Sequence, residues 1–264
     1  MKLLVFGCSY TDSRYLELTA KDKNLKDHLK DNNGNYTESF SFWPDLLAEK
    51  LNMKCENYAQ CGFGNDGIYS TFVDTIAESK DIGIVIVMWS EFLRIGFEIE
   101  KRGPFKTSFD WFKINIGATN KNKELRSRQI EITEVLNKYG LISPNSLVRR
   151  SLRNFLSVQN ICENMNIPYM QVMGMPPAKK SMEMDICKHL IGSPYLDKIN
   201  RKTFLGWPLF PQIEEGFSCG GKLYDLDPNR DKYFINYNNV HPNAEGQKFI
   251  SELLYRRVNN EIVS

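Results

Sequence analysis

The sequence predicts a three-layer α/β domain built on a mainly parallel sheet. Three short apolar runs, at 3–6, 82–89 and 169–172, are each bounded by polar or turn residues, which is typical of strands covered on both faces. A weaker fourth run lies at 54–58. Segments in which apolar residues recur at helical spacing alternate with these runs, and this alternation indicates strands joined by right-handed helical crossovers.

The helices follow from the spacing of apolar residues and from their start signals. In the first, at 42–51, Pro44 suits the first turn, and Trp43, Leu46 and Leu47 fall on one face. The same spacing predicts further helices at about 67–78, 125–138, 146–165 and 244–258.

Two long stretches, at about 100–124 and 176–236, carry aromatic, proline and glycine residues without a clear period. The chain has 264 residues, 42% of them hydrophobic, and contains no repeat or low-complexity linker. We therefore predict one domain over 1–264, in which these two stretches are long lid insertions.

Composition excludes several classes of function. A net charge of +2 offers no electrostatic basis for binding nucleic acid or a membrane surface. The run at 3–6 is far too short for a signal peptide or a membrane span, so we expect a cytoplasmic protein. The six cysteines include no Cys-x-x-Cys pair, which favours reduced thiols over a metal site. The glycine-rich segment 62–67 lacks the lysine of a phosphate-binding loop, so no nucleotide cofactor is expected.

Ser9 and His241 are the candidate catalytic residues. Ser9 follows the first apolar run by three positions, which places its hydroxyl at the carboxyl end of a predicted strand, where ligands gather in such sheets. His241 precedes Pro242 and a predicted helix. A serine hydroxyl is a poor nucleophile until a base takes its proton, and histidine has a suitable pKa for that role near neutrality.

Four ordered segments together resemble the SGNH hydrolases, also called the GDSL esterase/lipase family. Segment 7–11, Gly-Cys-Ser-Tyr-Thr, is similar to the family's first block, and 57–62, Asn-Tyr-Ala-Gln-Cys-Gly, is similar to the second. Segment 85–90 occupies the place of the third block. Segment 238–243, Asn-Asn-Val-His-Pro-Asn, resembles the fifth, which is usually Asp-x-x-His-Pro.

The resemblance implies a flavodoxin-like fold and ester hydrolysis through a covalent acyl-enzyme. It makes Ser9 the nucleophile and His241 the general base, and it assigns the backbone N–H groups of Ser9 and Gly62 to the oxyanion hole. The spacing of the fifth block makes Asn238 the residue that orients His241, where the family has an aspartate.

This chain departs from the family at three positions. Cys8 replaces the aspartate before the nucleophile. The loop 89–94 lacks the asparagine that completes the family's oxyanion hole, so Ser90 is the candidate donor there, and Arg94 and Tyr10 are candidates for binding substrate.

The third departure concerns the histidine. An asparagine at 238 can accept a hydrogen bond from the imidazole, but it cannot stabilise an imidazolium by charge. Three carboxylates could approach the ring instead: Asp225, Asp227 and Asp231.

The sequence therefore predicts a serine esterase acting on an acyl or acetyl ester, with esters of carbohydrates among the candidate substrates. The alternative is a catalytically degenerate relative that binds a carbohydrate or a protein without turnover, because the oxyanion asparagine and the triad aspartate are both unmatched. The third-block variant resembles versions in phage-encoded relatives, and for a phage-encoded protein virion association is an alternative to the cytoplasmic location. The sequence indicates neither the exact substrate nor the oligomeric state.

Overall fold

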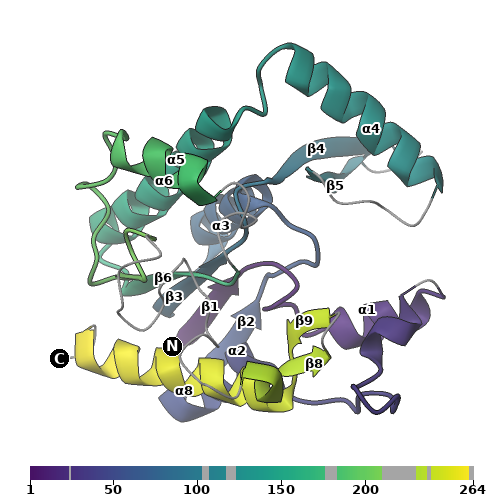
Figure 1. Ribbon diagram of the computed structural model, residues 1–264. Coiled ribbons are helices and arrows are strands. Elements are labelled where there is room, and N and C mark those ends of the chain that lie inside the picture. The colour runs from purple at the N-terminus through teal and green to yellow at the C-terminus, as the bar shows by residue number, and fades with distance from the viewer. Residues whose placement is uncertain are drawn as a thin grey trace.

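The computed structural model describes residues 1–23, 25–102, 107–116, 123–175, 183–209, 230–236 and 239–261 (Figure 1). Its central sheet has five parallel strands in the order β2-β1-β3-β6-β7. Counted along the chain within this sheet, the order is 2-1-3-4-5, which is the flavodoxin-like doubly wound arrangement. The predicted fold class is confirmed. The strands are β1 (Lys2–Phe6), β2 (Lys54–Asn57), β3 (Ile82–Trp89), β6 (Tyr169–Met173) and β7 (Phe204–Leu205).

Helices cover both faces of this sheet (Figure 1). α2 (Trp43–Leu51) packs against the C-terminal α8 (Ala244–Glu261) on one face, and α3 (Asn65–Glu78), α5 (Pro144–Asn164) and α6 (Glu183–Ile191) lie on the other. α5 begins two residues earlier than predicted because Pro144 takes the first helical position. The Ser143 hydroxyl caps the helix by accepting from the N–H of Ser146 at 3.2 Å.

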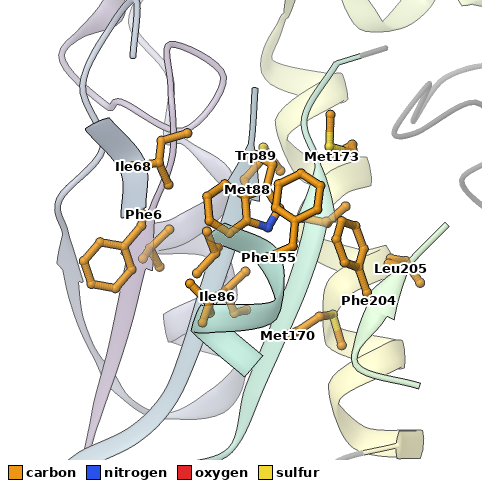
Figure 2. Close-up of a cluster of buried hydrophobic side chains, with 14 of the residues drawn as sticks. Phe6, Ile68, Ile86, Met88, Trp89, Phe155, Met170, Met173, Phe204 and Leu205 are labelled. Carbon is orange, nitrogen blue, oxygen red and sulfur yellow. The ribbon is translucent and has the colours of Figure 1, made fainter. Parts of the chain in front are cut away.

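The main core cluster fills both faces of the sheet, because it includes buried side chains of α2 and α8 as well as of α3, α5 and α6; Figure 2 shows a part of it around Phe155. Every residue of β3 from Gly83 to Trp89 is buried, which explains the uninterrupted apolar run. The rings of Trp89 and Phe204 pack on Phe155 with centroids 4.7 and 5.2 Å away, so strands and helix share one aromatic cluster. The indole N–H of Trp89 donates to Gln171 at 2.9 Å.

The predicted insertion near 100–124 overlaps a β-hairpin that starts earlier, at residue 94, and the beginning of a helix. The hairpin pairs β4 (Arg94–Arg102) with β5 (Thr107–Asn115), and α4 (Lys123–Lys138) follows it. Together they form a lobe beside the central sheet (Figure 1). This lobe has a small core of its own, which consists of Leu93, Ile95, Ile114, Ile142 and Leu147.

The C-terminal segment returns to the beginning of the chain. β8 (Phe234–Asn236) and β9 (Asn239–Pro242) form a short antiparallel pair beside α1 (Tyr15–Lys21) and the 3₁₀ helix Lys26–Leu29 (Figure 1). The hydroxyl of Tyr10 donates to the carbonyl of Val240 at 2.6 Å. Gln247 of α8 accepts from the N–H of Trp43 at 2.9 Å. These contacts join segments more than 200 residues apart.

Of the second predicted insertion, 176–182 and 210–229 lie outside the described residues, and its described part holds α6, β7, β8 and the 3₁₀ helix Arg230–Tyr233. Among the described helices, none combines the length and the apolar character needed to cross a membrane.

Candidate active site

Ser9 sits in a tight turn at the carboxyl end of β1, the strand flanked by β2 and β3. The N–H groups of Thr11 and Asp12 both donate to the carbonyl of Cys8, at 2.9 and 3.0 Å, which closes the turn around the serine. A Cβ atom on Gly7 would collide with the side chain of Thr11, so this turn requires glycine. The local sequence thus fixes the serine at the sheet edge where doubly wound folds place their ligands.

The structure brings Ser9 and His241 together. The Nε2 atom of His241 lies 2.8 Å from the Oγ atom of Ser9, although 231 residues separate the two in sequence. This distance is within hydrogen-bond reach, which a general base requires for the proton it abstracts.

Asn239 fixes which nitrogen of the imidazole carries the proton. Its amide Nδ2 atom donates to the carbonyl of His28 at 2.7 Å, and a carbonyl can only accept. The other amide atom, Oδ1, therefore faces His241 and accepts from the Nδ1–H of the ring at 2.6 Å. The neutral ring is then left with a lone pair on Nε2, directed at the hydroxyl of Ser9.

The residue that orients the histidine was predicted one position too early. Asn238 lies outside the described residues, and the contact with the Nδ1 atom is made by Asn239. The physical reason is that 239–242 is a strand, and side chains two positions apart on a strand point to the same face. Asp225 and Asp227 also lie outside the described residues, as does the side chain of Asp231.

Two tyrosines hold the imidazole ring in place. Tyr15 stacks on it with a centroid distance of 4.1 Å, and Tyr10 meets it edge-on at 5.1 Å. Tyr10 is 2% exposed and its hydroxyl is bonded to the Val240 carbonyl, so it supports His241 and does not reach substrate, contrary to the sequence prediction.

The surroundings of His241 favour its neutral form. Burial lowers the pKa of the ring well below its usual value of 6.5, and the positive charge of Arg94 lowers it further. The ring is therefore an available proton acceptor at neutral pH, but its environment offers little stabilisation to the imidazolium that forms when it accepts.

The segment predicted to supply the second oxyanion donor is a type II turn over residues 60–63. The N–H of Phe63 donates to the carbonyl of Gln60 at 3.2 Å, and Gly62 has a φ of +81°, which only glycine adopts readily at the third position of such a turn. Asn57 ties the segment to the Ser9 turn by donating to the carbonyl of Thr11 at 2.8 Å. Within the described part of the chain, the N–H groups of Ser9 and Gly62 have no hydrogen-bond acceptor and so remain available.

An ion pair between a buried carboxylate and a partly exposed guanidinium fastens this turn to the Ser9 turn. The carboxylate of Asp12, 2% exposed, accepts from the N–H of Cys61 at 2.9 Å and from the guanidinium of Arg14 at 2.8 Å. Arg14 also donates to the carbonyl of Ala59 at 3.0 Å. Burial alone would raise the pKa of Asp12, but the hydrogen bonds from Arg14 and Cys61 hold it below its usual value, so the carboxylate stays ionised.

The structure does not bring Ser90 to the site. Ser90 is fully buried, its N–H donates to Asn65 at 2.8 Å, and its Oγ atom lies 3.7 Å from the sulfur of Met175. The hydroxyl therefore faces the core, and the prediction that Ser90 completes the oxyanion hole is contradicted. Arg94 does reach the site, where its Nε atom pairs with Glu91 at 2.8 Å.

Ser9, Gly62, Arg94 and His241 line one cavity of about 480 Å³. Such a volume suits a small ligand. α1 and the segment that follows it supply a mixed wall that includes Leu18 and Leu25, and the β-hairpin and α4 supply a polar one. The remaining lining residues are Tyr15, Leu18, Thr19, Asp22, Leu25, Cys61, Lys113 and Gln129.

Serine is the best-placed nucleophile in this cavity. Burial raises the pKa of the Cys61 thiol well above its usual value, which leaves it protonated and unreactive. Cys8 is fully buried. Among the described residues, no group of three or more His, Cys, Asp or Glu side chains is placed to hold a metal ion.

No family model and no curated protein sequence matches this chain. Solved structures do match, among them that of a protein described as a lipolytic protein of the G-D-S-L family from Desulfitobacterium hafniense, which aligns with 97% of this chain and 98% of its own. The sequence identity is 14% and the TM-score is 0.41, which is a distant likeness of fold. The functional conclusion therefore rests on the geometry of the site.

Sequence reasoning missed four residues that shape the site: Asn239, Asp12, Arg14 and Lys113. Asn239 could have been identified from the strand pattern, because residues two positions apart on a strand point to the same face and Asn239 precedes His241 by two positions. Asp12 follows Ser9 by three positions, and a carboxylate so close to a candidate nucleophile was a usable signal. Nothing in the sequence marks Lys113, because its role depends on where the hairpin packs.

Proposed function

We propose that this protein is a serine hydrolase that cleaves a small acyl ester through an acyl-enzyme intermediate. The observation that carries the proposal is the hydrogen-bonded chain from Ser9 through His241 to Asn239, at 2.8 and 2.6 Å. It has the three parts of an activated nucleophile: a hydroxyl, a base within reach, and a group that orients the base.

In the first half of the proposed reaction, the Oγ atom of Ser9 attacks the ester carbonyl and its proton passes to Nε2 of His241. The N–H groups of Ser9 and Gly62 donate to the oxyanion that forms. His241 returns the proton to the leaving alcohol as the carbon–oxygen bond of the ester breaks, which leaves the acyl group on Ser9.

In the second half, water replaces the alcohol. His241 takes a proton from the water, the resulting hydroxide attacks the acyl-serine, and the acid leaves as Ser9 recovers its proton. The apolar side chains of Leu18 and Leu25, which are 48% and 37% exposed at the cavity wall, suit an apolar part of the substrate.

An asparagine can serve in this relay because its orientation is fixed. Replacing the triad aspartate of a serine protease by asparagine costs about 10⁴-fold in turnover, through the wrong tautomer of the histidine. In this protein the carbonyl of His28 and the hydroxyl of Tyr15 accept from the amide nitrogen of Asn239, so its oxygen selects the productive tautomer.

Labelling with a fluorophosphonate probe tests the proposal. The probe adds to an activated serine, so intact-mass analysis should show one adduct on the wild type, and peptide mapping should place it on Ser9. Ser9→Ala should remove the adduct, whereas Ser13→Ala, which alters an exposed serine of the same segment, should retain it. A folded wild-type protein that stays unlabelled would contradict the proposal.

The second candidate function is ligand binding without turnover. Its supporting observation is that an amide, and no carboxylate among the described residues, contacts the His241 ring, while the Arg94 charge opposes its protonation. This function predicts an unlabelled Ser9 and unchanged ligand affinity in Ser9→Ala. Labelling of Ser9 by the probe would exclude it.

A further inference from the structure

The β-hairpin packs directly on the turn that holds Gly62. Trp111 and Lys113 are two positions apart on β5, so their side chains share one face of the strand. The ring of Trp111 meets that of Phe63 edge-on at 5.5 Å. The ammonium of Lys113 lies 4.7 Å from the centroid of the same Phe63 ring.

Lys113 makes its shortest hydrogen bond to this turn. Its Nζ atom donates to the carbonyl of Cys61 at 2.8 Å, and a longer contact of 3.4 Å joins it to the side chain of Gln60. Gln129 of α4 donates to the backbone carbonyl of Lys113 at 3.2 Å and so fixes the strand behind it. The ammonium of Lys113 therefore faces two oxygen atoms of this turn.

The carbonyl that Lys113 contacts belongs to the same peptide unit as the N–H of Gly62. In a trans peptide these two groups point in opposite directions, so fixing the carbonyl fixes the N–H. Type I and type II turns differ by a flip of the peptide between their second and third residues, which here is the Cys61–Gly62 peptide. Such a flip would turn the N–H of Gly62 away from its present direction. A cation at the carbonyl also polarises the peptide and strengthens its N–H as a donor.

We infer that Lys113 is a positioning residue that holds the Cys61–Gly62 peptide so that its N–H points at the oxyanion formed on Ser9. Asp12 and Lys113 then clamp Cys61 from both sides, the carboxylate at its N–H and the ammonium at its carbonyl. The inference rests on the proposed function. It gives the hairpin a role in catalysis, because the hairpin carries the lysine that orients the Gly62 N–H.

The kinetic test replaces Lys113 by methionine. Lys113 also lines the cavity, and methionine keeps most of its bulk there while the peptide loses its clamp. We therefore expect kcat on an activated ester to fall by about 10- to 100-fold, with a much smaller change in KM. Lys113→Arg, which can still donate to the carbonyl, should restore most of kcat. Lys188→Met, at an exposed position on α6, is the matched control and should behave as wild type. A wild-type kcat in Lys113→Met would overturn the inference.

A second measurement is independent of turnover. In ¹⁵N-labelled protein, Lys113→Met should shift the amide resonance of Gly62, whereas Lys188→Met should leave it in place. An unchanged Gly62 resonance in Lys113→Met would overturn the inference. A wild-type protein that is not labelled by the fluorophosphonate probe would contradict the proposed function. The Gly62 amide shift in Lys113→Met would still test whether Lys113 positions this peptide.

Discussion

The two sides of the candidate site, the proposed proton-transfer side around His241 and the proposed oxyanion side around Gly62, are built from different kinds of interaction. Around His241 the contacts are neutral: a hydroxyl, an amide oxygen and two tyrosine rings. Around the Gly62 turn they are charged: the Asp12 carboxylate and the Lys113 ammonium both contact Cys61. In the proposed reaction His241 would become positively charged, and no described residue supplies a negative charge beside it. The oxyanion would form beside the Gly62 turn, which charged side chains hold in place.

This difference shows where the protein would obtain its rate acceleration. An amide beside the imidazole selects the tautomer but gives little stabilisation to the imidazolium. A rigid turn with a polarised N–H, and the guanidinium of Arg94 lining the same cavity, would stabilise the oxyanion. Variants on the two sides should therefore fail in different ways.

The largest effect is expected on removing the groups that react. Ser9→Ala and His241→Ala should each lower kcat on an activated ester by about 10³-fold or more, because neither residue can activate a nucleophile alone. The double variant should be little worse than either single variant, since the two act as one unit. Strictly multiplicative losses in steady-state kinetics would show that they act separately.

Asp12→Asn tests the oxyanion side. The Asp12 carboxylate accepts from the N–H of Cys61 with one oxygen and from the guanidinium of Arg14 with the other, whereas an asparagine has only one acceptor oxygen. One of these contacts should therefore be lost, and the Gly62 turn should become less rigid. We expect kcat to fall by about tenfold with a smaller change in KM. Asp185→Asn, on the exposed face of α6, is the control. A rise in KM with unchanged kcat would instead make Asp12 a determinant of ground-state binding.

Asn239→Asp tests the proton-transfer side through pH dependence. Only neutral His241 can accept the serine proton, and its lowered pKa should keep kcat/KM level from pH 8 down to about pH 5. A carboxylate beside Nδ1 favours the imidazolium, so the acid limb should move upward by more than about one pH unit. Asn160→Asp, at an exposed position on α5, should leave the profile unchanged. A wild-type acid limb near pH 6.5 would contradict this account.

The smallest effect is expected at Ser90. Its hydroxyl faces Met175 in the core, so Ser90→Ala should keep kcat within about twofold of wild type. A loss comparable to that of an oxyanion donor, about a hundredfold, would return Ser90 to the site and require the loop 89–94 to move.

The parts of the site that the sequence predicted are those fixed by local patterns. Three motifs can be recognised from the local sequence alone: the buried apolar run of β3, the glycine in the turn before Ser9, and the His241-Pro242 pair. The fold class follows from the alternation of strands and helices, and the position of Ser9 follows because parallel strands bring their carboxyl ends to one edge. The pairing with His241 was predicted from the two motifs together, since His241 lies on β9, outside the central sheet.

The parts that the sequence did not predict depend on packing. Ser90 was a candidate oxyanion donor because it ends the segment 85–90. In the structure Asn65 accepts from the backbone N–H of Ser90, and the Ser90 hydroxyl faces the core. The hairpin was missed because its described side chains do not alternate between buried and exposed: 97–100 are all exposed and 110–113 are all half-buried. Lys113 matters only because that hairpin meets the Gly62 turn.

Pre-steady-state kinetics with an activated aryl ester tests the central claim most directly. If Ser9 forms an acyl-enzyme, the wild type should release close to one equivalent of the aryl alcohol per protein in a rapid burst before the steady rate, and Ser9→Ala should show no burst. A wild type that releases the alcohol linearly, at the rate of Ser9→Ala, would contradict the claim that Ser9 is the nucleophile.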